Sequence, residues 1–483
     1  MTSATDTIRS AAGYLRSWVE AQAAHRRVPG VQVAVRSGDE LVLSAAVGVA
    51  DADAGTLLTP EHLFRIASHS KTFTATVVLQ LVEAGRMRLD DPIGQYVPEL
   101  ADGGSPIARA TLRELLGHQS GVVRDGEHAD FWQLEQPFPD RDGVVAEVLR
   151  GGVVHRRNEH FKYSNIGYAL VGLAIEAATG RSYAEQVRAA VLEPLGLTRT
   201  GPEYEPARAV EFAAGHTGLL LGEDARRTIG HVDTRAMAPA TGFYSTAEEL
   251  TVYGSAHCPG DDRLLTDDSK RLMQRLESVV TAYGSEIGRY GMGMALQTVG
   301  ERQLVGHSGG YPGHSTLTLV DPAATLVVSV LTNAIDGPAE DLAVGLMKLI
   351  DVALKPRAEV AAPPAGTPPL ATFTGRFASL WGCSTSPSSA GGWCWCGRPC
   401  PTPAGRGGAR GPGRRDAAGR RAAGLRAGGR ADPARAGRRR TGRVAAVRRR
   451  DLPAGRGVAP PSSGRDAWSR GRPPVDVEHP GEA

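Results

Sequence analysis

Two stretches with the alternating apolar pattern of β-strands stand far apart in this chain, and helical patterns fill much of the sequence between them. Val31, Val33 and Val35 alternate with small or polar residues before a predicted hairpin turn at 37–40 and a second strand at 41–49. Leu317 and Leu319 alternate in the same way before a turn at 321–324 and a strand at 326–331. Strands at both ends of a helical middle predict an α+β protein with a sheet domain, an all-α domain and a cleft between them.

Helices are predicted where apolar residues recur every three or four positions. The helix that begins near Phe73 is followed by Gly85, which stands where a C-cap glycine would. Another helix ends before Gly180. We expect a helical subdomain over about residues 92–240. The clearest helical patterns cover residues 5–24, 73–82, 166–177 and 339–352.

The charge is distributed unevenly along the chain. The net charge is +3 over 483 residues, but residues 383–483 contain 21 Arg, no Lys and 7 acidic residues. This tail is therefore near +14, and the preceding part of the chain is near −11. The part before the tail lacks the basic character that suits nucleic acid, so we expect no nucleic-acid partner.

Cysteine usage and hydropathy also narrow the class of protein. Cys258 is the only cysteine before residue 383, so no disulfide framework is predicted there. The first residues lack the basic and apolar regions of a secretion signal, and no later stretch approaches the roughly 18 apolar residues of a membrane span. We expect a cytoplasmic protein without a membrane partner, and the sequence leaves the oligomeric state open.

The first motif with chemical meaning is S-x-x-K at residues 68–71. Positions i and i+3 are neighbours on a helix, so Lys71 can take the hydroxyl proton of Ser68 directly. A lysine serves as a base only when burial or nearby cations lower its pKa from about 10.4. The positive end of the helix dipole favours negative charge on Ser68 and disfavours protonated Lys71. The motif predicts a nucleophilic serine with a lysine base.

The second motif is Y-x-N at residues 163–165, just before a predicted helix. A tyrosine near a lysine ammonium ionises more easily, so Tyr163 is a candidate general base. The Asn165 amide can contact both the Lys71 amine and a substrate carbonyl. The alternative is a buried tyrosine followed by a helix-capping asparagine.

The third motif is the glycine-rich segment at residues 306–310, which is expected to precede a strand. Its glycines let a substrate lie against the backbone, and the Gly310 N–H can join that of Ser68 in an oxyanion hole. His307 is a further catalytic candidate, and Ser308 and Gly309 are candidates for substrate binding. The alternative is a plain glycine turn.

In order and spacing, the three motifs resemble those of the class C β-lactamase and serine-esterase family of penicillin-recognising enzymes. That family combines S-x-x-K and Y-x-N with K-T-G or a His-x-Gly variant. The likeness covers about residues 8–355, and three supporting segments lie at 89–93, 111–121 and 242–250.

The resemblance implies a β-lactamase/transpeptidase-like fold, with a central antiparallel sheet flanked by helices beside an all-α domain. It implies one serine hydrolase domain over residues 1–355 that uses no cofactor and no metal. Ser68 would attack a carbonyl, and Lys71 and Tyr163 would shuttle protons. Backbone N–H groups of Ser68 and Gly310 would hold the oxyanion, and water would release the acyl group.

One departure from the family pattern bears on the substrate. His307 stands where β-lactamases and D,D-peptidases usually have a lysine, so a permanent cation is replaced by a group that ordinarily titrates near pH 6.5. Family members with histidine there include esterases and D-amino-acid amidases or peptidases. We therefore predict hydrolysis of esters or amides of small acyl substrates, with β-lactams as a weaker alternative.

Two rival interpretations use the same residues. Residues 306–310 also match G-x-S-x-G, which would make Ser308 the nucleophile of an α/β-hydrolase, but that motif needs a helix after it and a strand pattern follows instead. The chain could also be a catalytically silent sensor or binding protein that keeps the penicillin-recognising fold.

The end of the chain has a different composition. Prolines mark a linker at 356–369, and residues 370–382 resemble the start of a small β domain that is then truncated. Residues 383–483 are rich in Arg, Gly, Ala and Pro, and this composition predicts disorder. The codons of Gly-Trp-Cys-Trp-Cys-Gly at 392–397 can encode Leu-Val-Leu-Val in another frame, a strand-like run. We hypothesise that the tail is a frame-shifted product.

Overall fold

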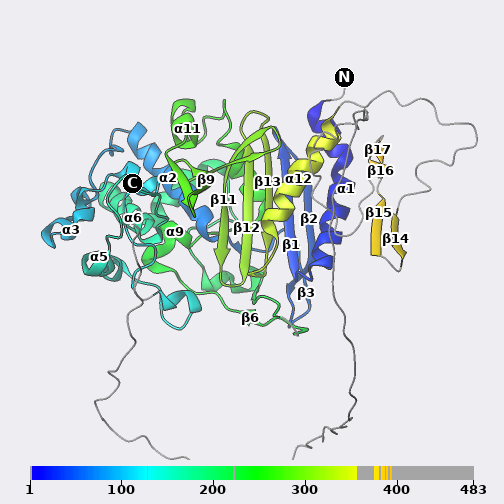
Figure 1. The fold of residues 1–483 in the computed structure, drawn as a ribbon, viewed down its shortest axis with the longest axis horizontal. Helices are drawn as coiled ribbons and strands as arrows, with labels where there is room; N and C mark the ends of the chain where they lie inside the picture. The colour runs from blue at the N-terminus through cyan, green and yellow to red at the C-terminus, as the bar shows by residue number, and fades with distance from the viewer. Residues whose placement is uncertain are drawn as a thin grey trace, which may run out of the picture. The chain divides into compact units, whose positions relative to one another are not determined.

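The computed structural model describes residues 3–127, 129–220 and 223–355, and the backbone of four short strands between residues 375 and 393. A nine-stranded antiparallel sheet forms the centre of the described chain (Figure 1). Its strand order is β3-β2-β1-β13-β12-β11-β10-β9-β8. These strands span Gly30–Ser37 (β1), Glu40–Asp51 (β2), Thr56–Leu57 (β3), Ser278–Ala282 (β8), Ser285–Tyr290 (β9), Ala295–Val299 (β10), Arg302–Tyr311 (β11), His314–Asp321 (β12) and Leu326–Thr332 (β13).

The two ends of the sequence meet inside this sheet. β1 pairs with β13 from Val31 opposite Thr332 to Ser37 opposite Leu326. β1 also forms the predicted hairpin with β2, which begins at Glu40. The predicted α+β class with a central antiparallel sheet is confirmed, because strands distant in sequence bury their apolar side chains on both sides of one sheet.

Helices α1 (Ala4–His25) and α12 (Ala339–Leu354) cover one face of the sheet and lie side by side in Figure 1. Their apolar residues share a core with alternate residues of the strands, including Val33 of β1 and Val330 of β13. Trp18 of α1 packs on Gly345 of α12, where an added Cβ would lie 2.2 Å from the indole. Gly345 therefore allows the two helices to approach closely.

The opposite face of the sheet packs against the helical part of the chain. Ala34 of β1 and Val327 of β13 point into this second core, together with Phe73 and Val77 of α2. Among the described helices, none has the length and apolar character needed to cross a membrane. The remaining helices are α2 (Ser70–Glu83), α3 (Pro98–Asp102), α4 (Leu112–Leu116), α5 (Arg141–Gly151), α6 (Asn165–Thr179), α7 (Tyr183–Val187), α8 (Glu193–Leu195), α9 (Ala238–Thr241), α10 (Ala247–Ser255) and α11 (Asp267–Gln274).

The helices predicted from periodicity are confirmed, with small shifts at their ends. The α2 helix begins at Ser70 rather than Phe73, and α1 extends one residue further at each end than predicted. Gly85 and Gly180, which follow α2 and α6, have φ values of +67° and +70°. These are left-handed values that favour glycine, so both helices end as their sequences indicate.

The strands from β8 to β11 were not predicted from the apolar pattern of the sequence. Residues 306–310 precede the strand β12 (His314–Asp321), as expected, but the alternative of a plain glycine turn is wrong, because these residues lie inside β11. Glycines and the polar His307 interrupt the apolar alternation there, so the pattern does not reveal a strand. A nucleophile elbow at Ser308 is also excluded, because β11 continues to Tyr311 and pairs with β12 rather than turning into a helix.

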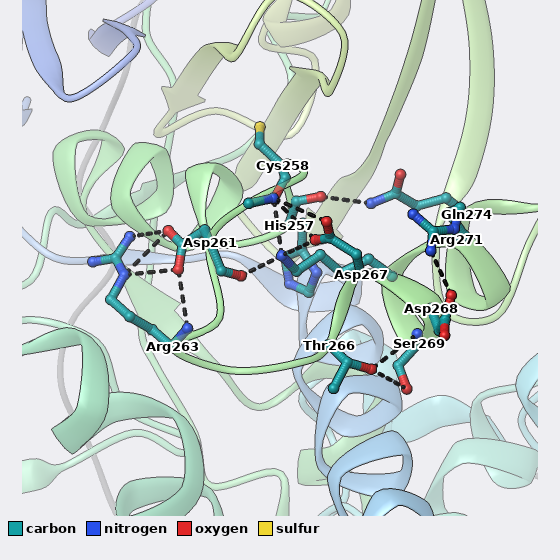
Figure 2. A network of polar contacts seen from close by, with 12 residues as sticks. His257, Cys258, Asp261, Arg263, Thr266, Asp267, Asp268, Ser269, Arg271 and Gln274 are labelled. Atoms are coloured by element: carbon teal, nitrogen blue, oxygen red, sulfur yellow. Dashed lines mark hydrogen bonds and ion pairs between the residues drawn. The ribbon is translucent and has the colours of Figure 1, made fainter.

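A polar network holds the connection between α10 and α11 against α2. The buried Lys270 amine donates to the Cys258 carbonyl at 2.9 Å and to the Asp267 carboxylate at 2.9 Å. Figure 2 shows Cys258, Asp261 and Asp267 gathered around this point. Thr266, the N-cap of α11, donates to Glu83 of α2 at 2.7 Å. The network thus braces the helix that begins within the S-x-x-K motif.

Four short strands follow the main part of the chain. β14 (Gly375–Ser379) pairs with β15 (Gly382–Ser386), and β16 (Ser388–Ser389) pairs with β17 (Gly392–Trp393), each antiparallel. The first pair coincides with the small β segment expected from residue 370. Strands also occur in the first residues of a tail whose composition predicts disorder. The linker at 356–369 and the tail beyond residue 393 lie outside the described residues, and the frame-shift hypothesis stays a prediction.

The contact between α1 and α12 can be tested with two glycine substitutions. Gly345→Ala should lower the free energy of unfolding by about 1 kcal/mol or more, because the new methyl overlaps Trp18 in a packed layer. Gly13 is exposed on α1 with no atom within 4 Å of an added Cβ, so Gly13→Ala should raise it by about 0.5–1 kcal/mol. Urea unfolding followed by circular dichroism measures both changes. Equal effects of the two substitutions would contradict the contact.

Candidate active site

Ser68 lies in a short 3-10 turn, Ala67–His69, directly before α2. Ala67 has a left-handed backbone, with φ +45°, which is strained for a residue with a side chain. The neighbouring His69 fixes the turn, since its ring contacts the Ile66 carbonyl at 2.9 Å and the Thr318 hydroxyl of β12 at 3.1 Å. The Ser68 side chain stays half-buried and accessible. The turn therefore presents Ser68 beside the strands β11 and β12.

Lys71 is fully buried and lies beside Ser68. Its Nζ is 3.2 Å from Ser68 Oγ, 2.7 Å from Asn165 Oδ1 and 2.8 Å from the Ala240 carbonyl oxygen. Burial holds the pKa of Lys71 well below its ordinary value, and the nearby Asp125 carboxylate opposes this only in part. A neutral amine donates two hydrogen bonds and keeps one lone pair. With Asn165 and Ala240 as acceptors, the lone pair is left for the Ser68 hydroxyl proton.

Tyr163 completes the contacts of the Ser68 hydroxyl. Its O–H donates to Ser68 Oγ at 2.8 Å, and its ring centre is 4.7 Å from Lys71 Nζ. Burial raises the pKa of Tyr163 well above its ordinary value, although the Ser68 contact opposes the shift. The expectation that Tyr163 ionises easily is therefore wrong for the resting site, because desolvation outweighs the nearby Arg124 charge. In the resting site Tyr163 is a neutral proton donor.

Asn165 stands at the first position of α6, and its side chain faces the site. Ser164 is the N-cap of α6 and accepts from the Gly167 N–H at 2.8 Å, so the alternative of a capping asparagine is wrong. The Asn165 amide instead donates to Asp125 Oδ1 at 2.6 Å. Asp125 thereby fixes the amide so that its oxygen faces Lys71. No motif marked Asp125, which lies in a loop far from Asn165 in sequence.

His307 points from β11 toward the same side of the sheet as Ser68. It lies opposite Thr318, which contacts His69. Its Nδ1–H donates to the Ser308 carbonyl at 2.6 Å, and its Nε2 accepts from the Tyr290 hydroxyl at 2.9 Å. Burial lowers the pKa of His307 to about 3. The expected titration near pH 6.5 is therefore wrong, and His307 is neutral at physiological pH.

The three residues after His307 have different surroundings. Ser308 lies opposite Leu317, whose side chain belongs to the core under α12, so its hydroxyl is directed away from His307 and Ser68. Gly309 lies against the nucleophile turn, where an added Cβ would be 2.1 Å from the Ile66 carbonyl oxygen. An added Cβ at Gly310 would have no atom within 4 Å. The roles of the three residues in substrate or oxyanion binding stay predictions.

A buried histidine that the sequence analysis did not select packs behind Tyr163. The ring of His118 lies 4.4 Å from that of Tyr163 and 4.8 Å from that of Tyr290, and its Nδ1 accepts from the Ser164 N–H at 3.2 Å. His118 has a left-handed backbone with φ +59°. It lies in the segment 111–121 that carries part of the family resemblance, which was the available signal. His118 therefore positions the Y-x-N segment.

The atoms around Ser68 are suited to acyl transfer rather than metal binding. They are an amine, a phenol and an amide, whereas metal sites collect imidazole, thiolate or carboxylate groups. Ser68 Oγ lies between the Tyr163 hydroxyl, which donates to it, and the Lys71 amine, whose pKa is lowered by burial. This arrangement can remove a proton from the hydroxyl and later return one to a leaving group.

Comparisons with known proteins agree with this geometry. The family model described as Beta-lactamase matches residues 15–350. The chain is 28% identical over 357 residues to Penicillin-binding protein 4 of Amycolatopsis lactamdurans, which covers 71% of this chain and 91% of that protein. A structure of D-amino acid amidase from Ochrobactrum anthropi SV3, complexed with L-phenylalanine amide, has a TM-score of 0.56 at 26% identity and covers 71% and 97% of the two chains. The octameric penicillin-binding protein homologue from Pyrococcus abyssi has a TM-score of 0.61 at 24% identity over 78% and 85%, which shows a shared fold alone.

The close approach of β11 to the nucleophile turn can be tested with adjacent glycines. Gly309→Ala should slow labelling of Ser68 by a fluorophosphonate about 100-fold, because the new methyl must push β11 away from the Ile66 carbonyl. Gly310→Ala is the matched control and should react at nearly the wild-type rate, since it meets no atom and keeps its N–H. Intact-mass kinetics measures both rates. Similar rates for the two variants would contradict the contact.

The protonation states predict the pH dependence of Ser68 acylation. Neutral Lys71 is the reactive form, so the rate should rise with pH through the lowered pKa of Lys71 and level off well below 10.5. His307 stays neutral above about pH 4, so no step is expected near pH 6.5. His307→Gln should leave the position of the rise unchanged. A rise near pH 6.5 that disappears in this variant would show that His307 titrates there.

Proposed function

This chain belongs to the beta-lactamase family, and we propose that it hydrolyses ester or amide bonds of small acyl substrates through an acyl-enzyme on Ser68. The resemblance read from the three motifs is confirmed at the level of the family, which consists of serine hydrolases. The observation that carries the proposal is the position of Ser68 Oγ between the Tyr163 hydroxyl at 2.8 Å and the Lys71 amine at 3.2 Å.

In the proposed acylation step, the Ser68 oxygen attacks the substrate carbonyl carbon as Lys71 accepts the hydroxyl proton. The carbonyl oxygen becomes an oxyanion, which the N–H groups of Ser68 and Gly310 stabilise. Tyr163 gives its proton to the leaving oxygen or nitrogen and regains one from Lys71. The bond to the leaving group then breaks and leaves an ester on Ser68.

Deacylation follows the same path in reverse with water as the nucleophile. Lys71 and Tyr163 together remove a proton from the water as it attacks the ester carbonyl. The proton returns to Ser68 Oγ when the ester bond breaks, and the product acid leaves. The buried amide of Asn165, held by Asp125, keeps the Lys71 amine oriented through both steps.

The charges beside Ser68 support a substrate without an obligatory carboxylate. His307 replaces the lysine typical of β-lactamases, and its pKa of about 3 leaves no cation at that position. Arg124 is exposed near Tyr163 but forms an ion pair with Asp125 at 3.1 Å. The similarity to a D-amino acid amidase also favours small amides. These observations support the proposal of ester or amide hydrolysis over that of a dedicated β-lactamase.

Labelling with a fluorophosphonate tests the nucleophile. The wild-type chain should gain one adduct mass, and Ser68→Ala should lose it and lose hydrolysis by at least about 10³-fold. Ser308→Ala is the matched control and should label normally, because its hydroxyl faces away from Lys71. Labelling of Ser68→Ala would locate the nucleophile elsewhere. No labelling of the wild type would favour the catalytically silent alternative.

Substrate class is tested separately by steady-state turnover of p-nitrophenyl acetate, a D-amino-acid p-nitroanilide and nitrocefin. We expect kcat/KM for the ester or the anilide to exceed that for nitrocefin, because the neutral His307 side chain does not provide a cation that would bind the carboxylate of a β-lactam. Ser68→Ala supplies the background rate for each substrate. Faster turnover of nitrocefin would contradict the proposed substrate class while leaving the acyl-enzyme mechanism intact.

A further inference from the structure

Three side chains with metal-binding atoms come together in the loop between α5 and the Y-x-N motif. They are His155, Glu159 and His160, and one ligand atom from each lies within 4.8 Å of the others. The two imidazole rings are 5.1 Å apart, and His160 Nε2 is 4.0 Å from Glu159 Oε1. All three side chains reach solvent, and none contacts Ser68 or Lys71 in the described part of the chain. The cluster is separate from the catalytic group.

The turn that brings these side chains together is held in place by hydrogen bonds to Glu114 of α4 and to Gln119. Asn158 has a left-handed backbone with φ +60°, and its N–H donates to the Gln119 carbonyl at 2.8 Å. Its side-chain amide donates to the buried carboxylate of Glu114 at 2.6 Å, and Arg157 contacts the same carboxylate at 3.0 Å. Two consecutive residues of the turn are thus fixed to α4. Because Arg157 and Asn158 are anchored, His155, which precedes them, and Glu159, which follows them, stay close to each other.

The Glu159 carboxylate is already oriented. Its Oε2 accepts from the Arg156 N–H at 3.1 Å, which leaves Oε1 toward the His160 ring. A ligand whose position is set before binding loses little conformational entropy when the ion arrives. The side chains of His155 and His160 reach solvent and can rotate toward an ion.

We propose that His155, Glu159 and His160 form a binding site for a divalent transition-metal ion of the Zn²⁺ class. Two imidazole nitrogens and one carboxylate oxygen form a donor set that suits Zn²⁺, Ni²⁺ or Cu²⁺, whereas Mg²⁺ and Ca²⁺ require oxygen ligands. Three protein ligands leave a fourth position for water. Zn–N and Zn–O distances of about 2.0–2.2 Å require the ligand atoms to close in from their present separation. Small rotations of the accessible side chains achieve this.

The site lies where two segments that border the catalytic group meet. The N–H of His155 donates to the Gly121 carbonyl at 3.3 Å, and the segment after Gly121 leads to Asp125. The loop then continues past His160 to Lys162, whose N–H donates to the His118 carbonyl at 2.8 Å, and to Tyr163. A bound ion would join both ends of the turn and stiffen the approach to Tyr163. Metal binding itself does not depend on the proposed hydrolase activity.

Isothermal titration with ZnCl₂ tests the site in the full chain. Accessible thiols are first blocked with iodoacetamide, because cysteines elsewhere in the chain also bind Zn²⁺. The wild type should bind one ion, and His155→Ala/His160→Ala should bind it at least about tenfold more weakly. Loss of a residue that only hydrogen-bonds to a metal ligand already lowers metal affinity about tenfold or more, and this variant loses two ligands. His25→Ala, which removes an exposed histidine of α1, is the matched control and should bind as the wild type does. MgCl₂ should give no binding heat.

Electron paramagnetic resonance of the Cu²⁺-loaded chain identifies the ligands independently. The wild-type spectrum should show coupling to two imidazole nitrogens, and His160→Ala should show coupling to one. Circular dichroism melting verifies that the variants fold, as expected for exposed side chains. Unchanged Zn²⁺ affinity in the double variant, or no Zn²⁺ binding by the wild type, would overturn the proposal.

Discussion

The burial of one amine governs the chemistry of this structure. Lys71 is enclosed, and two of its neighbours, Asn165 Oδ1 and the Ala240 carbonyl, accept hydrogen bonds without carrying charge. Burial disfavours a protonated lysine there, so the pKa falls, and the Asp125 carboxylate opposes this only in part. The fold makes this possible by bringing α2, α6 and α9 together around a single side chain. The same desolvation that costs folding free energy raises the fraction of Lys71 in the neutral form, which can accept a proton.

The neighbours of Lys71 follow from the same low-polarity surroundings. Burial raises the pKa of Tyr163 and lowers that of His307, so both are neutral in the resting protein. The Tyr163 hydroxyl donates to Ser68 Oγ, and the Lys71 amine lies 3.2 Å from the same oxygen, where its neutral form can accept the hydroxyl proton. The Asp125 carboxylate accepts from the Asn165 amide, which in turn accepts from the Lys71 amine. Charge is therefore kept one residue away from the reacting atoms.

Local patterns in the sequence predicted much of the fold. In α1, α6 and α12, apolar residues recur every three or four positions, and in β1 they alternate before the turn into β2. A short stretch of sequence is therefore enough to predict each of these elements. The strands β8 to β11 were missed for the opposite reason. In β11, Gly306, Gly309 and Gly310 contribute no side chain, and the strand's position in the sheet is set by its partners. The same holds for the site. Ser68, Lys71, Tyr163 and Asn165 belong to short motifs and were predicted, whereas Asp125 and His118 lie outside these motifs and were not.

The sequence by itself determined which groups could react, since S-x-x-K places Ser68 and Lys71 one helical turn apart and Y-x-N supplies Tyr163 and Asn165. It also determined roughly where the helices α1, α2, α6 and α12 lie. Only the tertiary structure decided the protonation states and the distances. Tyr163 became a donor rather than an easily ionised base, and His307 lost its ordinary titration, because desolvation depends on which distant segments cover a side chain. The meeting of Gly309 with the Ile66 carbonyl likewise depends on strand packing. Such contacts join residues hundreds of positions apart, and no local pattern encodes them.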